Sequence, residues 1–478
     1  MATKYFSQLS LADHFQECRN FFESDTPTFF ALLKEHINLS DFIPNSFYSA
    51  FYKSLGRNRD YPLHGFLTAL ILQKIFSIPT DSLLIILLHL SKELREFCGF
   101  SKVPDATKFT RFKQDFLPYL EQMFHSLVDY TDPICMAIDV TLASTITFDT
   151  TGIELYVKEN NPKTLNSLIK RLKTYYKDKP EVDPHKMAYG LMPSQAESSS
   201  YAKQLYINGH FCYADKLAII TNGLGIIRHI AFTDDDEFKS KHPDLEVEKK
   251  TDSPDQDKSI GDSSALIPVL EDFFLAHPTF HPHTFLGDSA FDSIEIYSAL
   301  KDSFHFSKAL IPYNPRNENT LIPVGYNEYG YPTCPNNPAL PMKYQGICRE
   351  RGRADRYKWG CPEMSYKKGQ WVCNCKEPCS TAVKGRTTYT YENMDFRRFP
   401  GIQRDSEEWT ATYKVRVVVE KGINHLKTNM CVAGRKSRNH LTTKADVYIA
   451  GIASQFTVIL ASRLNYPQYI RSLKPLIA

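Results

Sequence analysis

The sequence has little net charge and no long uninterrupted apolar run. Its formal net charge is +3, so the charge of the whole chain cannot indicate a nucleic-acid partner, and such a case must rest on local basic clusters. The most apolar stretch, residues 66–90, is interrupted by Lys74, Pro79 and Asp81. No apolar run follows the first lysine either. We therefore expect no signal peptide and no membrane span, which indicates a cytoplasmic protein.

Internal repeats of solenoid period are absent as well. The chain holds eleven cysteines among 478 residues. Without an export signal, these are expected to be free thiols or metal ligands rather than a disulfide framework. The composition, 42% hydrophobic and 23% charged, is that of a folded globular chain, and its length predicts two or three domains.

The spacing of apolar residues changes along the chain and predicts four parts. Residues 1–130 have the three- and four-residue spacing of helices, so an all-α N-terminal domain is expected. Residues 131–300 and 401–478 are predicted to form an α+β core. A Cys-containing, β-rich insertion over 301–400 would interrupt that core.

The predicted core begins with β-branched residues over 134–148, which we interpret as one or two strands ending at Asp149. Asn161 and Pro162 then have the character of an N-cap and a first-turn proline, which predicts a basic amphipathic helix. An Asn-Gly pair at 222–223 lies between two β-rich runs and is the strongest short-range signal of a hairpin.

Further elements are predicted after the hairpin. The charged segment 234–262 is expected to be a solvated loop rather than a metal site. A helix over 263–276 and a short strand over 284–287 should follow, which leaves Asp288 directly after a strand. Asp292 and the glutamate three residues later have the spacing of a capping box, which predicts the start of another helix.

One C-terminal helix combines an apolar face with a polar stripe. Tyr413 is followed by Arg416, Glu420 and Lys427 at offsets of 3, 7 and 14 residues, which places the four within roughly 60° of one another on a helix. A separate arc is apolar and contains Val415, Val418, Val419, Ile423 and Leu426. The periodicity alone would also fit an ordinary amphipathic helix with a solvated polar face.

The pattern Tyr-x2-Arg-x3-Glu-x6-Lys resembles the signature around the catalytic glutamate of DDE-type insertion-sequence transposases with a Y-R-E-K motif. FDTTGIELYVKENNPK (148–163) is similar to the stretch around that group's first aspartate, and FLGDSAFDS (285–293) to the strand end with its second. The N-terminal helices also resemble the domain that precedes the catalytic core in these proteins. The resemblance covers most of the chain and implies an RNase H-like core, with a mixed sheet flanked by helices, in a bacterial transposase.

The resemblance implies that Asp149, Asp288 and Glu420 are catalytic and bind metal. Cleavage and strand transfer at phosphodiester bonds use two Mg²⁺ (or Mn²⁺) ions, held by carboxylates that converge from different elements. We expect Asp149 to be shared between the ions, with Asp288 on one and Glu420 on the other. Asp139 is an alternative to Asp149, whereas capping explains Asp292, the rival of Asp288.

Basic residues concentrate between Lys384 and Lys444, with 13 Lys and Arg against 6 Asp and Glu and a local net charge of +7. This region is the predicted DNA-facing surface, through phosphate contacts that position DNA without reading its sequence. The predicted DNA-binding side chains are Tyr413, Arg416, Lys421, Lys427, Arg435, Lys436 and Arg438. A helix-turn-helix-like reader is also predicted in the N-terminal domain, with Arg57, Arg59, Lys108, Arg111 and Lys113.

Six of the eleven cysteines fall within 46 positions, at 334, 348, 361, 373, 375 and 379. Their spacing lacks paired C-x2-C knuckles. Two interpretations therefore stay open: a structural Zn²⁺ on Cys361, Cys373, Cys375 and Cys379, or buried free thiols in a β-rich insertion.

Three functions are compatible with these features. The first is an active transposase that cleaves at the element's terminal inverted repeats and joins them to target DNA, as a homodimer because two ends must be joined. The others are a metal-dependent nuclease without strand transfer and a non-catalytic, relic DNA-binding protein. The intact acid trio and the intact four-residue signature favour catalysis.

Overall fold

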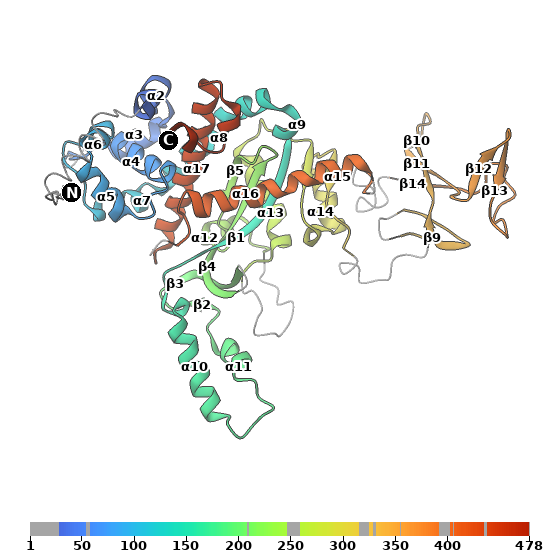
Figure 1. Cartoon of the computed structure of the whole chain (residues 1–478), viewed down its shortest axis with the longest axis horizontal. Helices are drawn as coiled ribbons and strands as arrows, with labels where there is room; N and C mark the ends of the chain where they lie inside the picture. Colours follow the sequence, from blue (N-terminus) through green and yellow to red (C-terminus); the bar gives the residue numbers. More distant parts are fainter. Residues whose placement is uncertain are drawn as a thin grey trace, which may run out of the picture.

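The structure, a computed structural model, describes residues 28–53, 58–207, 210–245, 259–314, 325–327, 331–353, 355–391, 402–404, 406–434 and 437–477. The chain is a mixed α+β protein. Helices of the N-terminal part lie at one end, a mixed sheet with its covering helices lies in the middle, and the small sheets of the insertion lie at the other end (Figure 1).

Helices form the described N-terminal part, in keeping with the apolar spacing. They are α2 (Thr28–His36), η1 (Leu39–Phe42), α3 (Asn45–Phe51), α4 (Leu63–Ile75), α5 (Asp81–Leu90), α6 (Lys92–Phe97), α7 (Ala106–Asp115) and α8 (Leu117–Ile138). Side chains cap α5, α6 and α7, because Thr80, Ser91 and Asp105 each accept a hydrogen bond from the backbone amide three residues on. These bonds satisfy amides that a helix leaves unpaired at its start.

Residues 134–148 differ from the prediction. Helix α8 continues to Ile138, a short helix α9 covers Val140–Ala143, and strand β1 spans Thr145–Glu154. Asp139 caps α9, since its carboxylate accepts a hydrogen bond from the Leu142 amide at 2.9 Å. The strand prediction is therefore wrong before Thr145, because a short apolar run fits a buried helix as well as a strand.

The central sheet has the strand order β2-β3-β4-β1-β6-β7, with β5 also paired to β4. Its other strands are β2 (Gln195–Ala196), β3 (Ser199–Ile207), β4 (His210–Asn222), β5 (Ile227–Ala231), β6 (Thr284–Leu286) and β7 (Lys308–Leu310). Strand β1 is antiparallel to β4 and parallel to β6, and β7 continues in the same direction as β6. The hairpin predicted at Asn222 is confirmed, and its turn contains Gly225 at a φ of +77° that favours glycine.

The segment predicted as a solvated loop is only partly exposed. Asp234 and Asp235 are buried, and Asp235 caps helix α12 (Asp236–Lys241). The middle of that segment, 246–258, lies outside the described residues. Helices α13 (Asp262–Ala276), α14 (Ile294–Ser298) and the π-helical turn η4 (Ala299–Ser303) follow, and α13 agrees with the predicted helix. The burial of these two aspartates depends on cationic partners that are distant in the sequence. The hydrophobicity of the segment alone could therefore not predict it.

Helix α17 (His440–Arg463) lies between the N-terminal helices and the sheet and packs along α8 (Figure 1). It is long and apolar enough to cross a membrane, but 89% of its apolar window is buried within the fold. The apolar side chains of α17 therefore belong to the core of the fold. The chain ends with a 3-10 turn, η9 (Pro467–Tyr469), and helix α18 (Lys474–Ile477).

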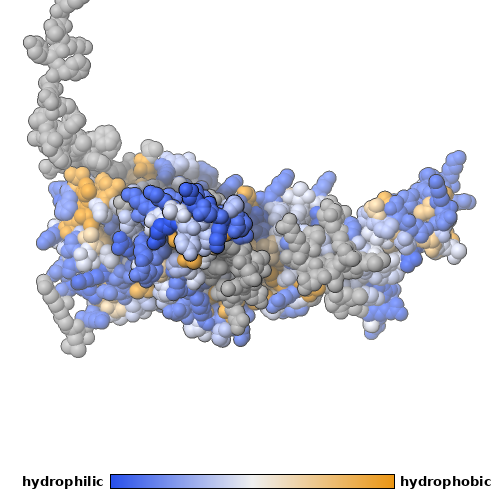
Figure 2. Space-filling model, turned by 90° about the horizontal axis from the view of Figure 1, so that it is seen from below, coloured by the Kyte–Doolittle hydropathy of each residue, from blue (hydrophilic) through white to orange (hydrophobic). Residues whose placement is uncertain are grey.

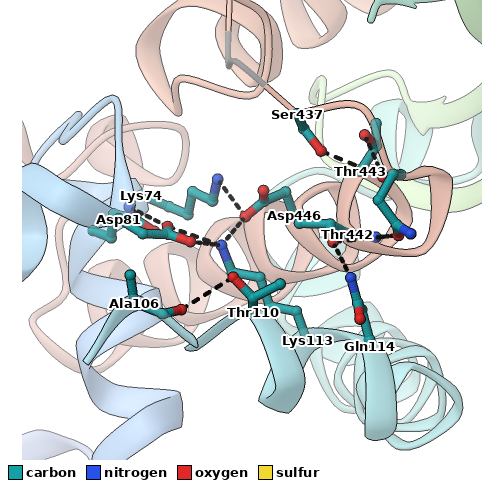
Figure 3. A network of polar contacts seen from close by, with 12 residues as sticks. Lys74, Asp81, Ala106, Thr110, Lys113, Gln114, Ser437, Thr442, Thr443 and Asp446 are labelled. Atoms are coloured by element: carbon teal, nitrogen blue, oxygen red, sulfur yellow. Dashed lines mark hydrogen bonds and ion pairs between the residues drawn. The ribbon is translucent and has the colours of Figure 1, made fainter. Parts of the chain in front are cut away.

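A buried ionic network joins the N-terminal helices to α17 (Figure 3). The Lys113 ammonium lies 2.8 Å from an Asp81 oxygen and 2.9 Å from an Asp446 oxygen, and Lys74 lies 3.3 Å from the same Asp446 oxygen. Lys113 is fully buried, so its predicted role in DNA binding is wrong. A basic residue in an amphipathic helix can pair with an acid from another element, which the sequence of that helix alone does not show.

Two helices form an arm that extends away from the sheet (Figure 1). After the turn η2 (Lys158–Asn160), α10 (Pro162–Tyr175) begins at the predicted cap, where the side-chain Oδ1 of Asn161 accepts a hydrogen bond from the Lys163 amide. Ile169 and Leu172 pack on Ala188 of α11 (Pro184–Leu191). Figure 2 looks along this arm and shows it mostly hydrophilic.

The insertion is β-rich and has a small core of its own. Its strands are β8 (Thr333–Cys334), β9 (Asn337–Pro341), β10 (Lys343–Cys348), β11 (Arg356–Gly360), β12 (Met364–Lys367), β13 (Gln370–Cys373) and β14 (Thr387–Tyr391). Tyr331, Met342 and Trp359 form a separate buried cluster among them. At the base of the insertion, the buried Arg404 donates to the Ile311 carbonyl at 3.1 Å and to the Tyr297 hydroxyl at 2.6 Å.

Candidate carboxylate site

Two of the predicted acids lie on neighbouring parallel strands. Strands β1 and β6 pair from Thr145 with Thr284 to Thr147 with Leu286. Continuing this register by two residues brings Asp149 level with Asp288. Asp149 lies in the middle of β1, not at its end as predicted, because β1 continues along β4 to Glu154. Asp288 lies two residues after the end of β6, one residue further from the strand than predicted, and its carboxylate accepts a hydrogen bond from the Ala290 amide at 2.8 Å.

Helix α16 (Val417–Asn424) covers the face of β1 that carries Asp149. Side chains alternate between the two faces of a strand, so Thr147 and Asp149 share a face. The Thr147 hydroxyl is 2.7 Å from that of Thr221 on β4, and a Cβ on Gly422 would lie 3.4 Å from the Thr221 methyl group. The helix that carries Glu420 therefore lies directly over this part of the sheet.

The predicted C-terminal helix is divided into α15 (Glu407–Tyr413), η7 (Lys414–Arg416), α16 and the π-helical turn η8 (His425–Asn429). Val419, Ile423 and Leu426 are buried. Val415 and Val418 are half-buried. Contacts to the sheet fix both ends of the polar stripe. The Tyr413 hydroxyl donates to the Gly287 carbonyl at 3.3 Å. The Lys427 ammonium donates to the Thr151 hydroxyl at 3.0 Å and to the Gly152 carbonyl at 2.9 Å.

Arg416 lies between two of the acids. Its guanidinium donates to Glu420 at 2.7 Å and lies 3.8 Å from Asp288. A carboxylate from a helix and a carboxylate from a strand end therefore share one cation. Three residues of the stripe thus contact β1 or the segment after β6, and the fourth, Glu420, contacts Arg416.

Asp149 is a half-buried acid. Burial raises the pKa of Asp149 to about 6, a shift that the Thr150 amide and Arg416 oppose and that Asp262 and Asp288 increase. A carboxylate that is costly to ionise gains from a cation placed beside it. Asp149 thus has both the position and the electrostatic environment of a ligand for a cation.

Asp262 is a fourth acid near this site that sequence reasoning did not select. Its carboxylate accepts hydrogen bonds from the Thr150 hydroxyl at 2.6 Å, and the Lys216 ammonium lies 2.7 Å from it. It is the first residue of α13, whereas the sequence predicts the end of a loop at this position. The available signal was an acid at the start of a predicted helix, but pairing across the sheet to Thr150 is a tertiary property.

The residues of the trio fit a pair of hard divalent cations. All of their donors are carboxylate oxygens, which Mg²⁺ prefers. Among the described residues, groups of three potential ligands within 4.8 Å of one another occur twice, and this trio is not one of them. The three carboxylates are therefore not gathered at metal-binding distance, although Asp288 and Glu420 share Arg416, and binding would draw them closer together.

The two rival aspartates have other partners. Asp292 is fully buried, accepts a hydrogen bond from the Asn314 amide at 2.6 Å and lies 3.8 Å from Arg404. The capping prediction for Asp292 is wrong, because Ser293 caps α14 through the Ile296 amide. Asp139 caps α9, as described above. Both side chains are thus used within the fold.

The predicted DNA-binding residues have different surroundings. Lys421 is exposed beside a cavity of about 220 Å³ that Arg471 also lines. Arg438 is exposed and lies 5.3 Å from the centre of the Tyr156 ring. Lys427 is held by β1. Arg435 and Lys436 lie outside the described residues.

The N-terminal helices keep part of the predicted basic surface. Arg59, Lys108 and Arg111 line an open cavity of about 420 Å³ together with Lys53 and aromatic side chains. Arg59 also lies 4.8 Å from the centre of the Phe51 ring. Arg57 lies outside the described residues.

The cysteines of the insertion gather without forming a preassembled metal site. Cys334 and Cys361 are buried, and Cys348, Cys373, Cys375 and Cys379 are half-buried. Partial burial and a hydrogen bond with the Cys373 thiol raise the pKa of Cys375 to about 11, and burial also raises the pKa of Cys361. No three of these sulfur atoms lie within 4.8 Å of one another among the described residues.

Comparison with known proteins supports one function. Residues 16–115 match a family described as a transposase domain (DUF772). This match covers the N-terminal helices through α7 and not the carboxylate site. No curated protein matches the chain. The N-terminal part of the chain is therefore similar to a transposase domain, and this similarity suggests an activity on DNA.

Proposed function

We propose that the chain is a DDE-type transposase that cleaves at the ends of a bacterial insertion sequence and joins those ends to target DNA. One observation carries the proposal: Asp149, Asp288 and Glu420 approach one another from a strand, a strand end and a helix, around Arg416. Converging carboxylates from separate elements are what metal-dependent phosphodiester chemistry needs.

The order of the strands supports an RNase H-like core. Strands β1, β4 and β5 are successive antiparallel neighbours, and β6 and β7 lie on the other side of β1, parallel to it. This gives the order β5-β4-β1-β6-β7 with the first acid on the central strand. The helix with the third acid packs across β1 and β4.

The trio would hold two Mg²⁺ or Mn²⁺ ions, with Asp149 shared between them, Asp288 on one and Glu420 on the other. When bound, the ions supply an activated oxygen nucleophile and stabilise the leaving 3′ oxygen. Arg416 holds Asp288 and Glu420 in place and is free to turn its guanidinium to a phosphate, since 21% of its side chain is exposed. Lys427 and Tyr413 position the helix on the sheet.

The basic surfaces would bind DNA. The arm has seven exposed basic residues: Lys163, Lys170, Arg171, Lys173, Lys177, Lys179 and Lys186. Its acids are Asp178, Glu181 and Asp183, so a net positive charge extends away from the core. Together with Lys421, Arg438 and the N-terminal cavity, the arm offers phosphate contacts along an extended DNA. We propose terminal inverted repeats and target DNA as partners, a homodimer on DNA and a location at the bacterial nucleoid.

The direct test is Mg²⁺-dependent cleavage and joining of a DNA that carries the presumed element ends. D149N, D288N and E420Q should each abolish both steps. D139N is the matched control, because asparagine caps a helix as well as aspartate does, and it should cleave and join like the wild type. Wild-type activity in all three acid variants, with unchanged circular dichroism, would refute the assignment.

The same assay separates the alternatives. Cleavage without joining would favour a metal-dependent nuclease, and binding of end DNA without cleavage would favour a relic DNA-binding protein. Sedimentation of the complex with end DNA tests the dimer, and finding only monomer on DNA would contradict it.

A structural Zn²⁺ on Cys361, Cys373, Cys375 and Cys379 is a separate proposal, supported by the proximity of the thiols. It requires the loops between β12 and β14 to close around the ion. Metal analysis of the purified chain should find zinc that C373S with C379S removes, and absence of zinc from the wild type would refute it.

A further inference from the structure

Three histidines from separate elements meet inside the fold. His125 lies on α8, His229 on β5, and His277 directly follows α13. One potential ligand nitrogen of each lies within 4.8 Å of the other two. His229 and His277 are buried, and His125 is half-buried. Histidine is often exposed or isolated, so three in contact within a core call for an explanation.

The contacts of His277 orient the cluster. Its Nδ1 is 2.6 Å from a carboxylate oxygen of Asp129, and its Nε2 is 3.0 Å from Nδ1 of His125. With Nδ1–H donated to Asp129, Nε2 of a neutral His277 is an acceptor that faces Nδ1 of His125. A carboxylate behind a histidine in this way is the usual support of a metal-binding imidazole.

His229 has an unused polar atom in the same place. Its Nδ1 is buried and has no hydrogen-bond partner among the described residues, and only 4% of the residue is exposed. Leaving a buried nitrogen unpaired costs roughly 1–3 kcal/mol. A ligand at the centre of the cluster would remove that cost.

The three imidazoles are in the form that binds metal. Burial lowers the pKa of His125 to about 3, and burial also lowers the pKa of His229 and of His277. Neutral histidine is the ligand form, so protons do not compete for these nitrogens at neutral pH.

The cluster is separate from the carboxylate site. His229 pairs with Ile220 across β4 and β5, and Ile220 pairs with Phe148 across β4 and β1. Residues directly opposite one another share a face, whereas Phe148 and Asp149 are successive and point to opposite faces. The histidines therefore lie on the other side of the sheet from the acid trio.

We propose that His125, His229 and His277 bind one divalent transition-metal ion of the zinc class, with Asp129 orienting His277. Imidazole nitrogens suit zinc, and three of them with one open position are a common zinc set. Zn–N bonds of about 2.0–2.1 Å in a tetrahedron place the nitrogens roughly 3.3 Å apart. Spacings from 3.0 Å to within 4.8 Å need only small side-chain movements to reach this.

The binding step conserves protons. With a neutral His277 protonated on Nδ1 toward Asp129, the hydrogen bond between the two rings requires the proton of His125 to be on its Nδ1. On binding, the proton of His125 would be carried on Nε2 instead, so that Nδ1 takes the metal and the ring stays neutral. A cavity of about 160 Å³, which His125 and His229 line together with Glu121 and Lys241, leaves room for a water molecule as the fourth ligand. The ion would connect α8, β5 and α13 at one point.

The test uses the full chain with C361S and C373S, so that the thiols of the insertion cannot account for bound metal. After removal of metal with a chelator, the chain is titrated with Co²⁺ and with Zn²⁺. We expect one ion per chain and the visible absorption of tetrahedral cobalt, without the near-ultraviolet band of thiolate ligands. Zn²⁺ should also raise the melting temperature.

Variants locate the ion. H277Q should abolish binding. D129N changes an exposed residue and keeps all three histidine ligands. It should weaken metal binding by about 10- to 100-fold. H185Q, an exposed histidine on the arm, is the matched control and should bind like the parent. A parent chain that binds no Co²⁺ or Zn²⁺, or equal binding in D129N, H277Q and the parent, would overturn the proposal.

Discussion

Arg416 occupies the position between Glu420 and Asp288 that decides whether the acids can approach one another. Without its charge, two carboxylates beside the half-buried Asp149 would repel each other. Lysine would keep the charge but lose the planar fork that contacts both acids at once. The residue thus links the geometry of the site to its electrostatics.

Because of this position, R416Q should lower the rate of DNA cleavage by about 10²- to 10³-fold. This is the usual effect of losing one preorganised hydrogen-bond donor at a reacting phosphate or oxyanion. R416K should fall between R416Q and the wild type. Single-turnover cleavage at saturating Mg²⁺ measures the effect, with circular dichroism as the control for folding. A wild-type rate in R416Q would remove Arg416 from the site.

His440 predicts a dependence of stability on pH. Its ring nitrogens lie 3.1 Å from Asp215 and 3.4 Å from Asp235. Burial opposes the charged form, but the two carboxylates outweigh it and raise the pKa of His440 to about 9. The folded state therefore holds this proton more tightly than the unfolded state, whose pKa is about 6.5.

The stabilising contribution of His440 is fully present below about pH 6.5 and is lost as pH rises through about 9, with an upper bound of roughly 3 kcal/mol. Urea unfolding of the wild type and of H440Q should show a difference that is largest near pH 6 and small above pH 9. A difference independent of pH would mean that the proton is not shared with these carboxylates.

The positions of single site residues could be predicted where the residue type and the predicted helix or strand were considered together. Glu420 and Asp288 lie where the helix and the strand end place them. The sequence places Asp149 on the right strand, but at its end rather than in its middle. It does not indicate that Asp262 lies near the site. Both errors concern tertiary pairing, which spacing along the chain does not encode.

Elements differ in how well their sequences define them. The α10 cap, the β4–β5 hairpin and α13 were predictable from local rules. The strand predicted over 134–143 is helical, because its apolar residues pack against α17 and its neighbours rather than in a sheet. Local propensity yields to packing where a short segment could form either structure.

The arm gives a prediction about DNA binding. Lys170, Arg171 and Lys173 are exposed on α10. K170Q, R171Q and K173Q together should weaken binding of end DNA and lower the slope of log K against log salt by about 2–3, since each phosphate contact contributes about 0.9. Fluorescence anisotropy at several salt concentrations measures both quantities.

The control variant removes three positive charges from outside the arm. Lys34, Lys92 and Lys102 are exposed on α2, on α6 and after α6. Their replacement by glutamine should leave the salt slope unchanged. An equal loss in both triple variants would mean that the arm provides only general positive charge.

The contact between α17 and the N-terminal helices rests on Asp446, which two buried lysines approach. Removing one partner of a buried ionic group leaves charge uncompensated, so D446N should lower the free energy of unfolding by about 3–5 kcal/mol. E96Q, in an exposed pair with Lys92 at 3.9 Å, should change it by less than about 1 kcal/mol. Equal effects in urea titrations would show that the network contributes no more than a surface pair.

Among the described residues of the whole molecule, one large hydrophobic cluster is accompanied by several small ones. The large hydrophobic cluster runs from the N-terminal helices through the sheet to α17. Its buried members include Ile311 and Val419 but no described residue between these two positions in the sequence. The described part of the insertion contributes instead to the separate cluster around Trp359. The N-terminal helices are therefore joined to the core through a continuous apolar interior, whereas the insertion is not. The sequence predicted an insertion from its cysteines and strands, but not this difference in packing.

The base of the insertion is closed by contacts that belong to the core. Arg404 bonds to Ile311 and Tyr297, and Asp292 lies beside it. Replacing residues 315–401 by a linker of about eight Gly and Ser residues, with a root-mean-square reach of roughly 15 Å, should therefore keep the fold. Differential scanning calorimetry should find a main transition within about 5 °C of the wild type, and a chain that loses this transition or aggregates would show that the insertion stabilises the core. Because α15 and α16 begin just beyond this closed base, Arg416 and Glu420 should keep their places in the shortened chain.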